Sequence, residues 1–439
     1  MSANQPDTIV AIATPPGKGG VGVIRLSGPK ALALGQQLTA KTLPARTAVF
    51  AHFKDANQEV IDTGLALYFA GPRSFTGEDV VEIQGHGGPV IQDLLLTELI
   101  RLGARQARAG EFSERAFLND KIDLTQAEAI ADLIDSSTAQ AAKGAMRSLQ
   151  GDFSRHVNAL LKQLIELRMY VEAAIDFPDE EIDFLADEKL RQRIDQLQTD
   201  LQQTIKQAGQ GAILRNGLSL VIAGKPNAGK SSLLNALSGH EAAIVTDIPG
   251  TTRDVVRETI DIDGLPVHII DTAGLRESDD TVEKIGIERA RKAINEADHV
   301  LIIVDASDAD EPPISVDHKA TTLVYNKIDL VPPTNLGAAL QVSAKHGTGI
   351  TELRDYIKQL AGYSQEGETL FTARRRHLTA LEQARDAVKR GIDQLKINNA
   401  GELLADELLQ AQQSLNSITG EFSADDLLGE IFSGFCIGK

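Results

Sequence analysis

A glycine-rich turn between an apolar run and a helix-like stretch carries the clearest chemistry in this sequence. Residues 224–231 read Gly-Lys-Pro-Asn-Ala-Gly-Lys-Ser and follow the apolar residues 218–223. Such a turn exposes successive backbone N–H groups to phosphate oxygens, and the positive end of the following helix faces the same anion. In this pattern Lys230 reaches the β- and γ-phosphates, and the Ser231 hydroxyl binds Mg²⁺. The sequence therefore predicts a site for a nucleoside triphosphate.

Two later motifs predict that the base is guanine. Asn326-Lys327-Ile328-Asp329 follows the apolar residues 322–325, and Ser343-Ala344-Lys345 follows a second short apolar run. The Asp329 carboxylate can accept hydrogen bonds from N1–H and the exocyclic amine of guanine, whereas adenine would leave it unpaired. The second motif suits the loop that covers the base. This pattern argues against another hypothesis, that the protein is an ATP-using kinase or transport ATPase.

The residues that activate water are less obvious. Asp271 ends an apolar strand and can hold Mg²⁺ through water, and the Gly274 N–H can meet the γ-phosphate. Leu275 stands where small GTPases carry a water-orienting glutamine, so another group must position water and another positive charge must serve the transition state. From the residues alone, the candidates for positioning water are the acids Glu277, Asp279, Asp280 and Glu283. Arg253 and Arg276 could supply the positive charge.

The stretch 241–254 occupies the place of a first switch, with Thr252 as the natural second Mg²⁺ ligand. Its Gly-Thr-Thr-Arg-Asp ending, together with Asn227 in the phosphate loop, resembles the TrmE/Era branch of P-loop GTPases, and more narrowly the MnmE (TrmE) family of tRNA modification GTPases. The resemblance implies a potassium-dependent GTPase that is activated by dimerisation of its G domains. It implies K⁺ ligands from the Asn227 side chain and from backbone oxygens of Thr246, Ile248 and Thr251. A cation there would neutralise charge on the leaving oxygens.

By the same resemblance Glu283 orients water, and Glu283, Asn227 and Thr252 are the expected catalytic residues. The expected nucleotide contacts are Asn227, Ala228, Gly229, Lys230, Ser231, Ser232, Thr246, Asp247, Ile248, Pro249, Gly250, Thr251, Thr252, Asp271, Thr272, Ala273, Gly274, Asn326, Lys327, Asp329, Ser343, Ala344 and Lys345.

The N-terminal strings 75–88 and 110–121 resemble the N-terminal domain of the same family, which is similar to tetrahydrofolate-binding domains and carries dimer contacts. The resemblance implies that 5-formyl-tetrahydrofolate or a related folate binds Arg25, Glu82, Lys121 and, from the C-terminal tail 435–439, Lys439. A carboxylate can pair with the pterin amine edge, and Arg and Lys can meet the glutamate tail or carbonyl groups. Without the resemblance these are ordinary surface charges.

Three other features are expected to be structural. The Pro- and Gly-rich residues 15–22 form a glycine turn and no second phosphate loop, because Val23 and Ile24 follow them. His86, between glycines, is expected to be a structural histidine and not a base. Cys436 is expected to be an apolar filler and not a nucleophile.

Hydrophobic periodicity predicts the elements that must position these residues. The alternation of strands and helices from about 214 to 364 predicts a doubly wound, mostly parallel sheet. Before residue 214 and after residue 364, apolar residues recur at intervals of three and four, as in packed helices. Breaks in this pattern fall near 398–401 and at Gly420. The stripe before it consists of Leu149, Phe153, Val157, Leu160, Leu161 and Leu164.

We therefore predict a multidomain α/β plus α protein. An N-terminal α+β, folate-binding-like and dimerising domain spans 1–118. A discontinuous helical bundle spans 119–213 and 365–439, the latter with the C-terminal tail. A Ras-like, doubly wound P-loop G domain of the TrmE type is inserted at 214–364.

The composition of the chain indicates where the protein works and which partners it is expected to bind. The 439 residues include 24% charged and 42% hydrophobic residues and a single cysteine, and no apolar run approaches the ~18 residues that span a bilayer. The polar N-terminus is no signal peptide, so we expect a cytoplasmic protein with no membrane partner. The net charge of −18 disfavours tight, autonomous binding to nucleic acid. The one compact basic run, residues 374–377, is expected to decorate the start of a helix.

The resemblance implies an enzyme that works as a homodimer with the flavin-containing protein MnmG (GidA) in a hetero-oligomer. The pair would add an aminomethyl-type (carboxymethylaminomethyl) group at C5 of the wobble uridine of certain tRNAs. Folate would supply the one-carbon unit, FAD would come only from the partner, and tRNA would be bound mostly through the complex. The alternative is an Era-like ribosome-assembly switch without modification activity. Such a switch should carry a basic RNA-binding appendage, which this acidic sequence lacks.

Overall fold

The computed structural model describes residues 7–176, 188–239, 257–271, 294–308, 316, 318, 320–331, 340–363, 371–398, 400–420, 425–435 and 438. The chain divides into two compact units, Met1–Ala131 with Gln413–Lys439, and Asp132–Gln412. None of the helices in the described ranges combines the length and the apolarity that a bilayer crossing needs.

The first unit is built on a six-stranded sheet in the order β3-β4-β5-β2-β1-β6. Neighbouring strands are antiparallel except β1 and β6. The strands are β1 (Ile9–Ile12), β2 (Gly19–Ser27), β3 (Val49–Lys54), β4 (Val60–Phe69), β5 (Val80–Gly87) and β6 (Arg105–Gln106). The glycine turn predicted over 15–22 is shorter than expected, because Gly19 already pairs with Gly87 as part of β2.

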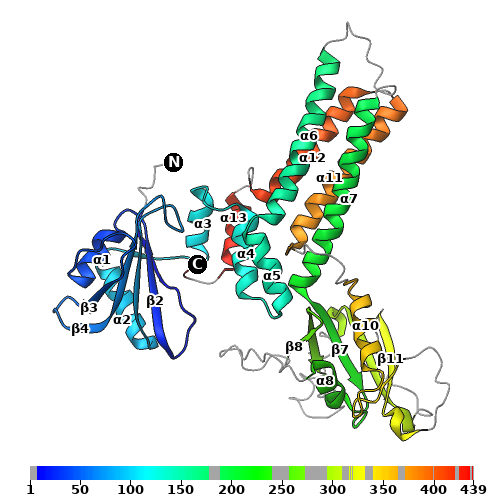
Figure 1. Ribbon diagram of the computed structural model, residues 1–439, viewed down its shortest axis with the longest axis horizontal. Coiled ribbons are helices and arrows are strands. Elements are labelled where there is room, and N and C mark those ends of the chain that lie inside the picture. The colour runs from blue at the N-terminus through cyan, green and yellow to red at the C-terminus, as the bar shows by residue number, and fades with distance from the viewer. Residues whose placement is uncertain are drawn as a thin grey trace. The chain divides into compact units, whose positions relative to one another are not determined.

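Helices cover one face of this sheet. α1 (Ala31–Thr39) and α2 (Pro89–Arg101) lie on it and bury Leu34, Leu95 and Leu99 against strand residues such as Ile24 and Ile83 (Figure 1).

The end of the chain packs onto the same unit. α13 (Asp425–Ser433) contributes Phe432 to an apolar cluster that also contains Phe435 and residues of α4 (Leu124–Ile134). α3 (Glu111–Leu118) begins after Gly110, which has a left-handed φ of 66°. Because Gly110 has no Cβ atom, its backbone can pass close to the Phe432 carbonyl. Gly438 lies against β1, since a Cβ atom on it would be 2.3 Å from the Ile12 carbonyl oxygen.

Long helices dominate part of the second unit. Figure 1 shows α6 (Asp152–Asp176), α7 (Glu188–Asn216) and α11 (Arg375–Asn398) side by side with α12 (Gly401–Thr419). The predicted breaks near 398–401 and at Gly420 are confirmed by the ends of α11 and α12. The predicted apolar stripe is buried along α6 from Phe153 to Leu164.

One residue of that stripe was misassigned. Leu149 ends α5 (Ala139–Leu149), because Gly151 adopts a φ of 84° and separates the two helices. The basic run does lie at a helix start as predicted, since α11 begins at Arg375, but His377 is buried within it.

The remaining part of the second unit is a six-stranded sheet in the order β12-β11-β10-β7-β9-β8, parallel except for β8. It confirms the predicted doubly wound α/β fold. Its strands are β7 (Leu218–Gly224), β8 (Arg257–Ile262), β9 (Leu265–Asp271), β10 (His299–Asp305), β11 (Thr321–Asn326) and β12 (Leu340–Gln341). α8 (Lys230–Ser238) and α10 (Ile350–Leu360) bury Leu233, Leu237 and Leu353 on one face.

Candidate functional site

The predicted phosphate loop is a tight turn between β7 and α8. Asn227 and Gly229 adopt left-handed φ values of 65° and 89°, which curl the backbone of residues 225–229. Gly229 precedes the first residue of α8, and no described side chain caps this helix. The first N–H groups of α8 therefore have no side-chain acceptor, and such a helix start attracts an anion. The loop fits the phosphates that its sequence predicts.

Lys230 lies over this loop. Its Nζ donates hydrogen bonds to the carbonyl oxygens of Gly224 (2.9 Å) and Lys225 (3.1 Å). Ser231 and Ser232 are exposed in the first turn of α8. The ammonium group and the Ser231 hydroxyl are thus available on the side of the loop where phosphate oxygens and Mg²⁺ would bind.

Asn326 joins the phosphate loop to the predicted base loop. It is buried, its Nδ2 donates to the Ala228 carbonyl (3.0 Å), and its Oδ1 accepts from the Ala344 N–H (3.1 Å). Residues of three separate motifs, 228, 326 and 344, therefore meet at one side chain. The Asn326 side chain therefore holds the turn before α8 and the loop after Val342 together.

Lys327 has a partner that sequence reasoning missed. Its φ is 63°, and its Nζ lies 2.6 Å from Oδ2 of Asp305 at the end of β10. Burial opposes ionisation of Asp305, but hydrogen bonds from Lys327 and Ser307 outweigh it and lower the pKa of the carboxyl group. The sequence did contain a signal for Asp305, since it is an acid at the end of an apolar run, as Asp271 is.

Asp329 is held ready to accept hydrogen bonds. Its Oδ1 accepts from the Ser343 hydroxyl at 2.6 Å, and His346 Nε2 lies 3.6 Å from Oδ2. The hydrogen bond from Ser343 lowers the pKa of Asp329. An ionised carboxylate fixed in this way can take both donors of a guanine edge.

Several predicted residues cannot be compared with the structure. Asp271 ends β9 beside Ile222 of β7, but its side chain lies outside the described part of the chain. The other predicted residues outside the described ranges are Thr246, Asp247, Ile248, Pro249, Gly250, Thr251, Thr252, Arg253, Thr272, Ala273, Gly274, Arg276, Glu277, Asp279, Asp280, Glu283, Cys436 and Lys439.

The predicted folate residues lie in the first unit. Arg25 and Glu82 face each other on β2 and β5, and the guanidinium group donates to Glu82 Oε1 at 2.8 and 3.0 Å. The same guanidinium lies over the ring of Phe75 at 5.7 Å. Lys121 Nζ donates to the Pro72 carbonyl at 3.0 Å. The loop that contains Pro72 and Phe75 therefore touches both predicted cations.

His86 is paired with a buried acid. Its Nδ1 lies 2.6 Å from Asp62 Oδ1, and its N–H donates to Asp62 Oδ2 at 2.7 Å. Asp62 thus fixes the end of β5 through both the ring and the backbone of His86.

Comparisons with known proteins cover nearly the whole chain. The family profile described as GTP-binding protein TrmE N-terminus matches residues 8–121, and the profile described as MnmE helical domain matches residues 124–436. The tRNA modification GTPase MnmE of Pseudomonas aeruginosa (strain UCBPP-PA14) is 58% identical, with 99% of each chain covered. The protein of the same name from Pseudomonas fluorescens (strain Pf0-1) is 57% identical, with 100% of each chain covered.

Among solved structures, the G domain of the T. maritima FeoB iron transporter is 24% identical over 33% of this chain and 98% of that chain, with a TM-score of 0.24. On the identity and coverage of its sequence relatives, the chain belongs to the MnmE family of tRNA modification GTPases.

Proposed function

We propose that this protein is a potassium-dependent GTPase that is activated when the G domains of two copies associate. With an MnmG-type flavoprotein it would add an aminomethyl-type group at C5 of the wobble uridine of certain tRNAs. The observation that supports nucleotide binding best is the Asn326 side chain, which ties the phosphate loop to the loop after Val342. A site for phosphates and a site for a base are useful together only when one ligand spans them.

Residue roles within this proposal follow from chemistry. Lys230 and the N–H groups at the start of α8 would bind the phosphates, and Asp329 would bind the base. Ser231 and Thr252 would hold Mg²⁺, which neutralises phosphate charge when bound. The exposed side chain of Asn227 and the backbone oxygens of Thr246, Ile248 and Thr251 would hold K⁺. Because Leu275 cannot orient water, we assign that task to Glu283.

Folate binding is proposed for Arg25, Glu82, Lys121 and Lys439. Arg25 and Glu82 already form one ion pair, so a ligand would have to share or replace that pair. Gly438 lies against the carbonyl of Ile12, and β1 pairs directly with the stretch of β2 that carries Arg25. Gly438 therefore packs on the strand that neighbours the one carrying Arg25.

The test of the GTPase mechanism is the turnover rate measured against protein concentration in K⁺ and in Na⁺. Turnover per molecule should rise with concentration in K⁺ and stay low in Na⁺. Asn227→Ala should remove the stimulation by K⁺ but keep nucleotide affinity, and Glu283→Ala should lower turnover without changing that affinity. Equal turnover of the parent protein in both salts would reject the potassium mechanism.

The modification step is tested separately. Loss of the gene product should remove the wobble-uridine modification, as read by mass spectrometry of hydrolysed tRNA. For folate, calorimetry with 5-formyl-tetrahydrofolate should show weaker binding by Glu82→Gln. Glu98→Gln is a matched control, because Glu98 pairs with Arg101 on α2. Equal affinities of the two variants for the folate would show that Glu82 does not bind it.

A further inference from the structure

Two chain connections join the sheet that carries the phosphate loop to the helices of the second unit. The inbound connection, residues 214–218, leads from the end of α7 into β7. The outbound connection, residues 371–374, leads into α11. Both connections contact residues 132–148, which contain the end of α4, the turn after it and most of α5. We call these residues the α4–α5 corner.

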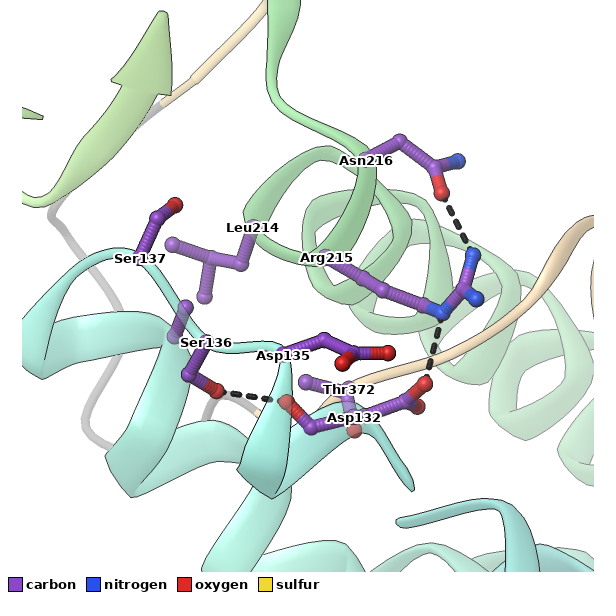
Figure 2. A pocket seen from close by; sticks show the side chains of 9 residues that line it. Asp132, Asp135, Ser136, Ser137, Leu214, Arg215, Asn216 and Thr372 are labelled. Carbon is purple, nitrogen blue, oxygen red and sulfur yellow. Dashed lines mark hydrogen bonds and ion pairs between the residues drawn. The ribbon is translucent and has the colours of Figure 1, made fainter. Parts of the chain in front are cut away.

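Asp132 of this corner binds both connections at once. Figure 2 shows Arg215 reaching its carboxylate from the last turn of α7, where Arg215 Nε lies 2.7 Å from Asp132 Oδ1. Arg374 Nη2, from the outbound connection, lies 2.8 Å from the same oxygen. Only 5% of the Asp132 side chain is exposed. A carboxylate this buried interacts strongly with its partners, and its removal leaves two cations close together.

The outbound connection is fixed to the corner a second time. Ser148 Oγ donates to the Thr372 carbonyl at 3.0 Å, and Phe371 stacks on Phe153 of α6 with ring centroids 4.7 Å apart. The outbound connection also packs against the backbone of α7, one turn before the inbound connection begins. A Cβ atom on Gly211 of α7 would lie 2.1 Å from the Phe371 carbonyl oxygen. The corner and both connections therefore form one packed assembly.

A third contact joins the corner to the sheet itself. Thr138 caps α5 by accepting from the Ala141 N–H (3.1 Å), and its hydroxyl donates to the Gly264 carbonyl at 3.0 Å. Gly264 lies in the turn between β8 and β9, and β9 runs from there to Asp271 alongside β7. Strand β9 therefore connects the corner directly to the edge of the sheet at which the nucleotide is expected.

We propose that Asp132 is a positioning residue that couples the nucleotide state of the sheet to the arrangement of the helices. This inference deepens the proposed function and rests on it. A shift of β9 against β7 on nucleotide binding would act on the corner through Gly264, and on Arg215 through the inbound connection. Because Asp132 holds Arg215 and Arg374 together, the helices must follow as one body. Such a coupling needs a contiguous packed network between the two sites, and these contacts provide one.

Hydrogen exchange of the full-length protein, read by mass spectrometry, tests this. Exchange is followed with no nucleotide, with GDP and with a non-hydrolysable GTP analogue, in peptides that cover residues 225–238 and 132–148. The variant is Asp132→Asn, which keeps the size of the side chain. Its control is Glu407→Gln, which removes an ion pair with Arg390 between α11 and α12 (2.8 Å), away from both connections.

In the parent protein and in Glu407→Gln, nucleotide should change exchange in both peptides, by at least about fivefold in the corner peptide. In Asp132→Asn, protection of the 225–238 peptide should remain, while the nucleotide-dependent change in the corner peptide is lost. A purely structural role would instead shift corner exchange equally in every nucleotide state. If Asp132→Asn fails to fold, Thr138→Val should show a reduced response and Thr138→Ser a normal one.

The outcomes separate the inference from the proposal beneath it. No protection of residues 225–238 in the parent would overturn the nucleotide site, and the coupling with it. Protection there with an unchanged corner would overturn the coupling alone. The same would follow if Asp132→Asn responded to nucleotide as Glu407→Gln does.

Discussion

Gly229 and Asn326 are packed so closely that no side chain fits between them. A Cβ atom on Gly229 would lie 2.3 Å from Asn326 Nδ2, the atom that donates to the phosphate loop. Gly229 also has a left-handed φ of 89°. Gly229→Ala should therefore displace Asn326 and weaken nucleotide binding on the order of tenfold or more. Titration with a fluorescent GDP analogue measures this.

Gly239→Ala is the matched control for that change. Gly239 also has positive φ, 65°, at the other end of α8, but no atom of the described residues lies within 4 Å of where its Cβ atom would stand. Gly239→Ala should therefore lower the stability of the protein somewhat through backbone strain and leave its nucleotide affinity nearly unchanged. If both variants weaken binding equally, strain in α8 is the cause, and the contact with Asn326 is not.

The second prediction concerns the base. Asp329→Asn replaces an acceptor by an amide that can donate, so it should lower GDP affinity on the order of 100-fold and improve the affinity for xanthosine diphosphate. Ser343→Ala removes the hydroxyl that holds Asp329 and that also accepts from the His346 N–H. It leaves the Asp329 carboxylate in place, so it should cause a smaller loss for GDP and no gain for the xanthine nucleotide. Competition titrations with the two diphosphates decide between these outcomes. An unchanged preference in Asp329→Asn would contradict the assignment.

The third prediction uses two glycines of α7. Gly211→Ala should destabilise the protein by about 1–3 kcal/mol, because its methyl group would collide with the Phe371 carbonyl 2.1 Å away. Gly209→Ala lies two residues earlier, where the new methyl group would meet no atom of the described residues. It should stabilise the protein by about 0.5–1 kcal/mol through helix propensity. Thermal unfolding of the full chain compares them. Equal shifts in the two variants would show that the outbound connection does not pack on α7.

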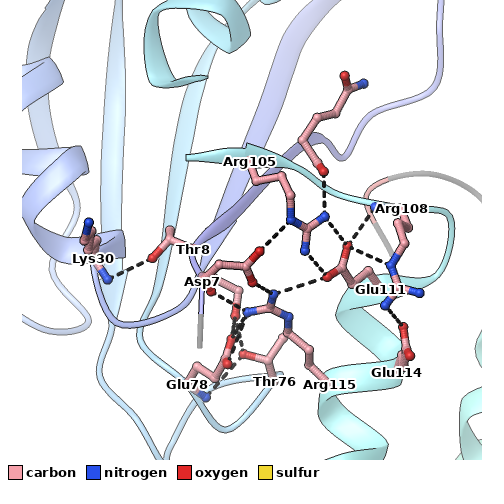
Figure 3. Close-up of polar contacts among 12 residues, drawn as sticks. Asp7, Thr8, Lys30, Thr76, Glu78, Arg105, Arg108, Glu111, Glu114 and Arg115 are labelled. Carbon is pink, nitrogen blue, oxygen red and sulfur yellow. Dashed lines mark hydrogen bonds and ion pairs between the residues drawn. The ribbon is translucent and has the colours of Figure 1, made fainter. Parts of the chain in front are cut away.

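The fourth prediction concerns pH. Figure 3 shows Asp7 between Arg105 and Arg115, with Asp7 oxygens 2.5 Å from Arg105 Nε and 2.6 Å from Arg115 Nη2. The hydrogen bond from Arg105 does most to lower the pKa of Asp7, from 3.8 to about 2, while partial burial opposes it. A lowered pKa stabilises the folded state above the unfolded value near 3.8, and this contribution is lost as pH falls towards 2.

Asp7→Asn should therefore cost stability at neutral pH, about 1 kcal/mol or less because 47% of the Asp7 side chain is exposed. Urea unfolding of parent and variant should show this gap closing between pH 4 and 2. A gap of constant size over that range would mean that the carboxylate charge is not what stabilises this corner of the sheet.

Local sequence patterns predicted where the loops of the candidate site fall along the chain. The phosphate loop, Asn326 and Asp329 follow strands whose apolar character is visible in the sequence, and parallel strands bring their ends to one edge. The order of the motifs along the chain was therefore enough to predict that these loops lie at the same edge of the sheet. Leu149 shows the limit of periodicity: it continues the spacing of the α6 stripe but belongs to α5, because Gly151 breaks the backbone.

The missed residues are those whose partners are distant in sequence. Asp132 meets Arg374 across 242 positions, and no spacing rule links an acid on one helix to a basic run before another. The run at 374–377 was correctly placed at a helix start, yet the buried contact of Arg374 could not be seen. Arg25 and Glu82 were both named as ligand contacts, while their pairing with one another required the register of β2 and β5.

The backbone contact between Gly211 and Phe371 bears on how such a chain could arise. Where the two ends of an inserted segment touch, closing the gap they leave requires only a short bridge, and the host loses little chain entropy when a guest is added or removed. The sheet that carries the phosphate loop thus leaves and rejoins the helices at two points that lie next to each other. Exchanging it for a homologous module would leave the host's own core intact.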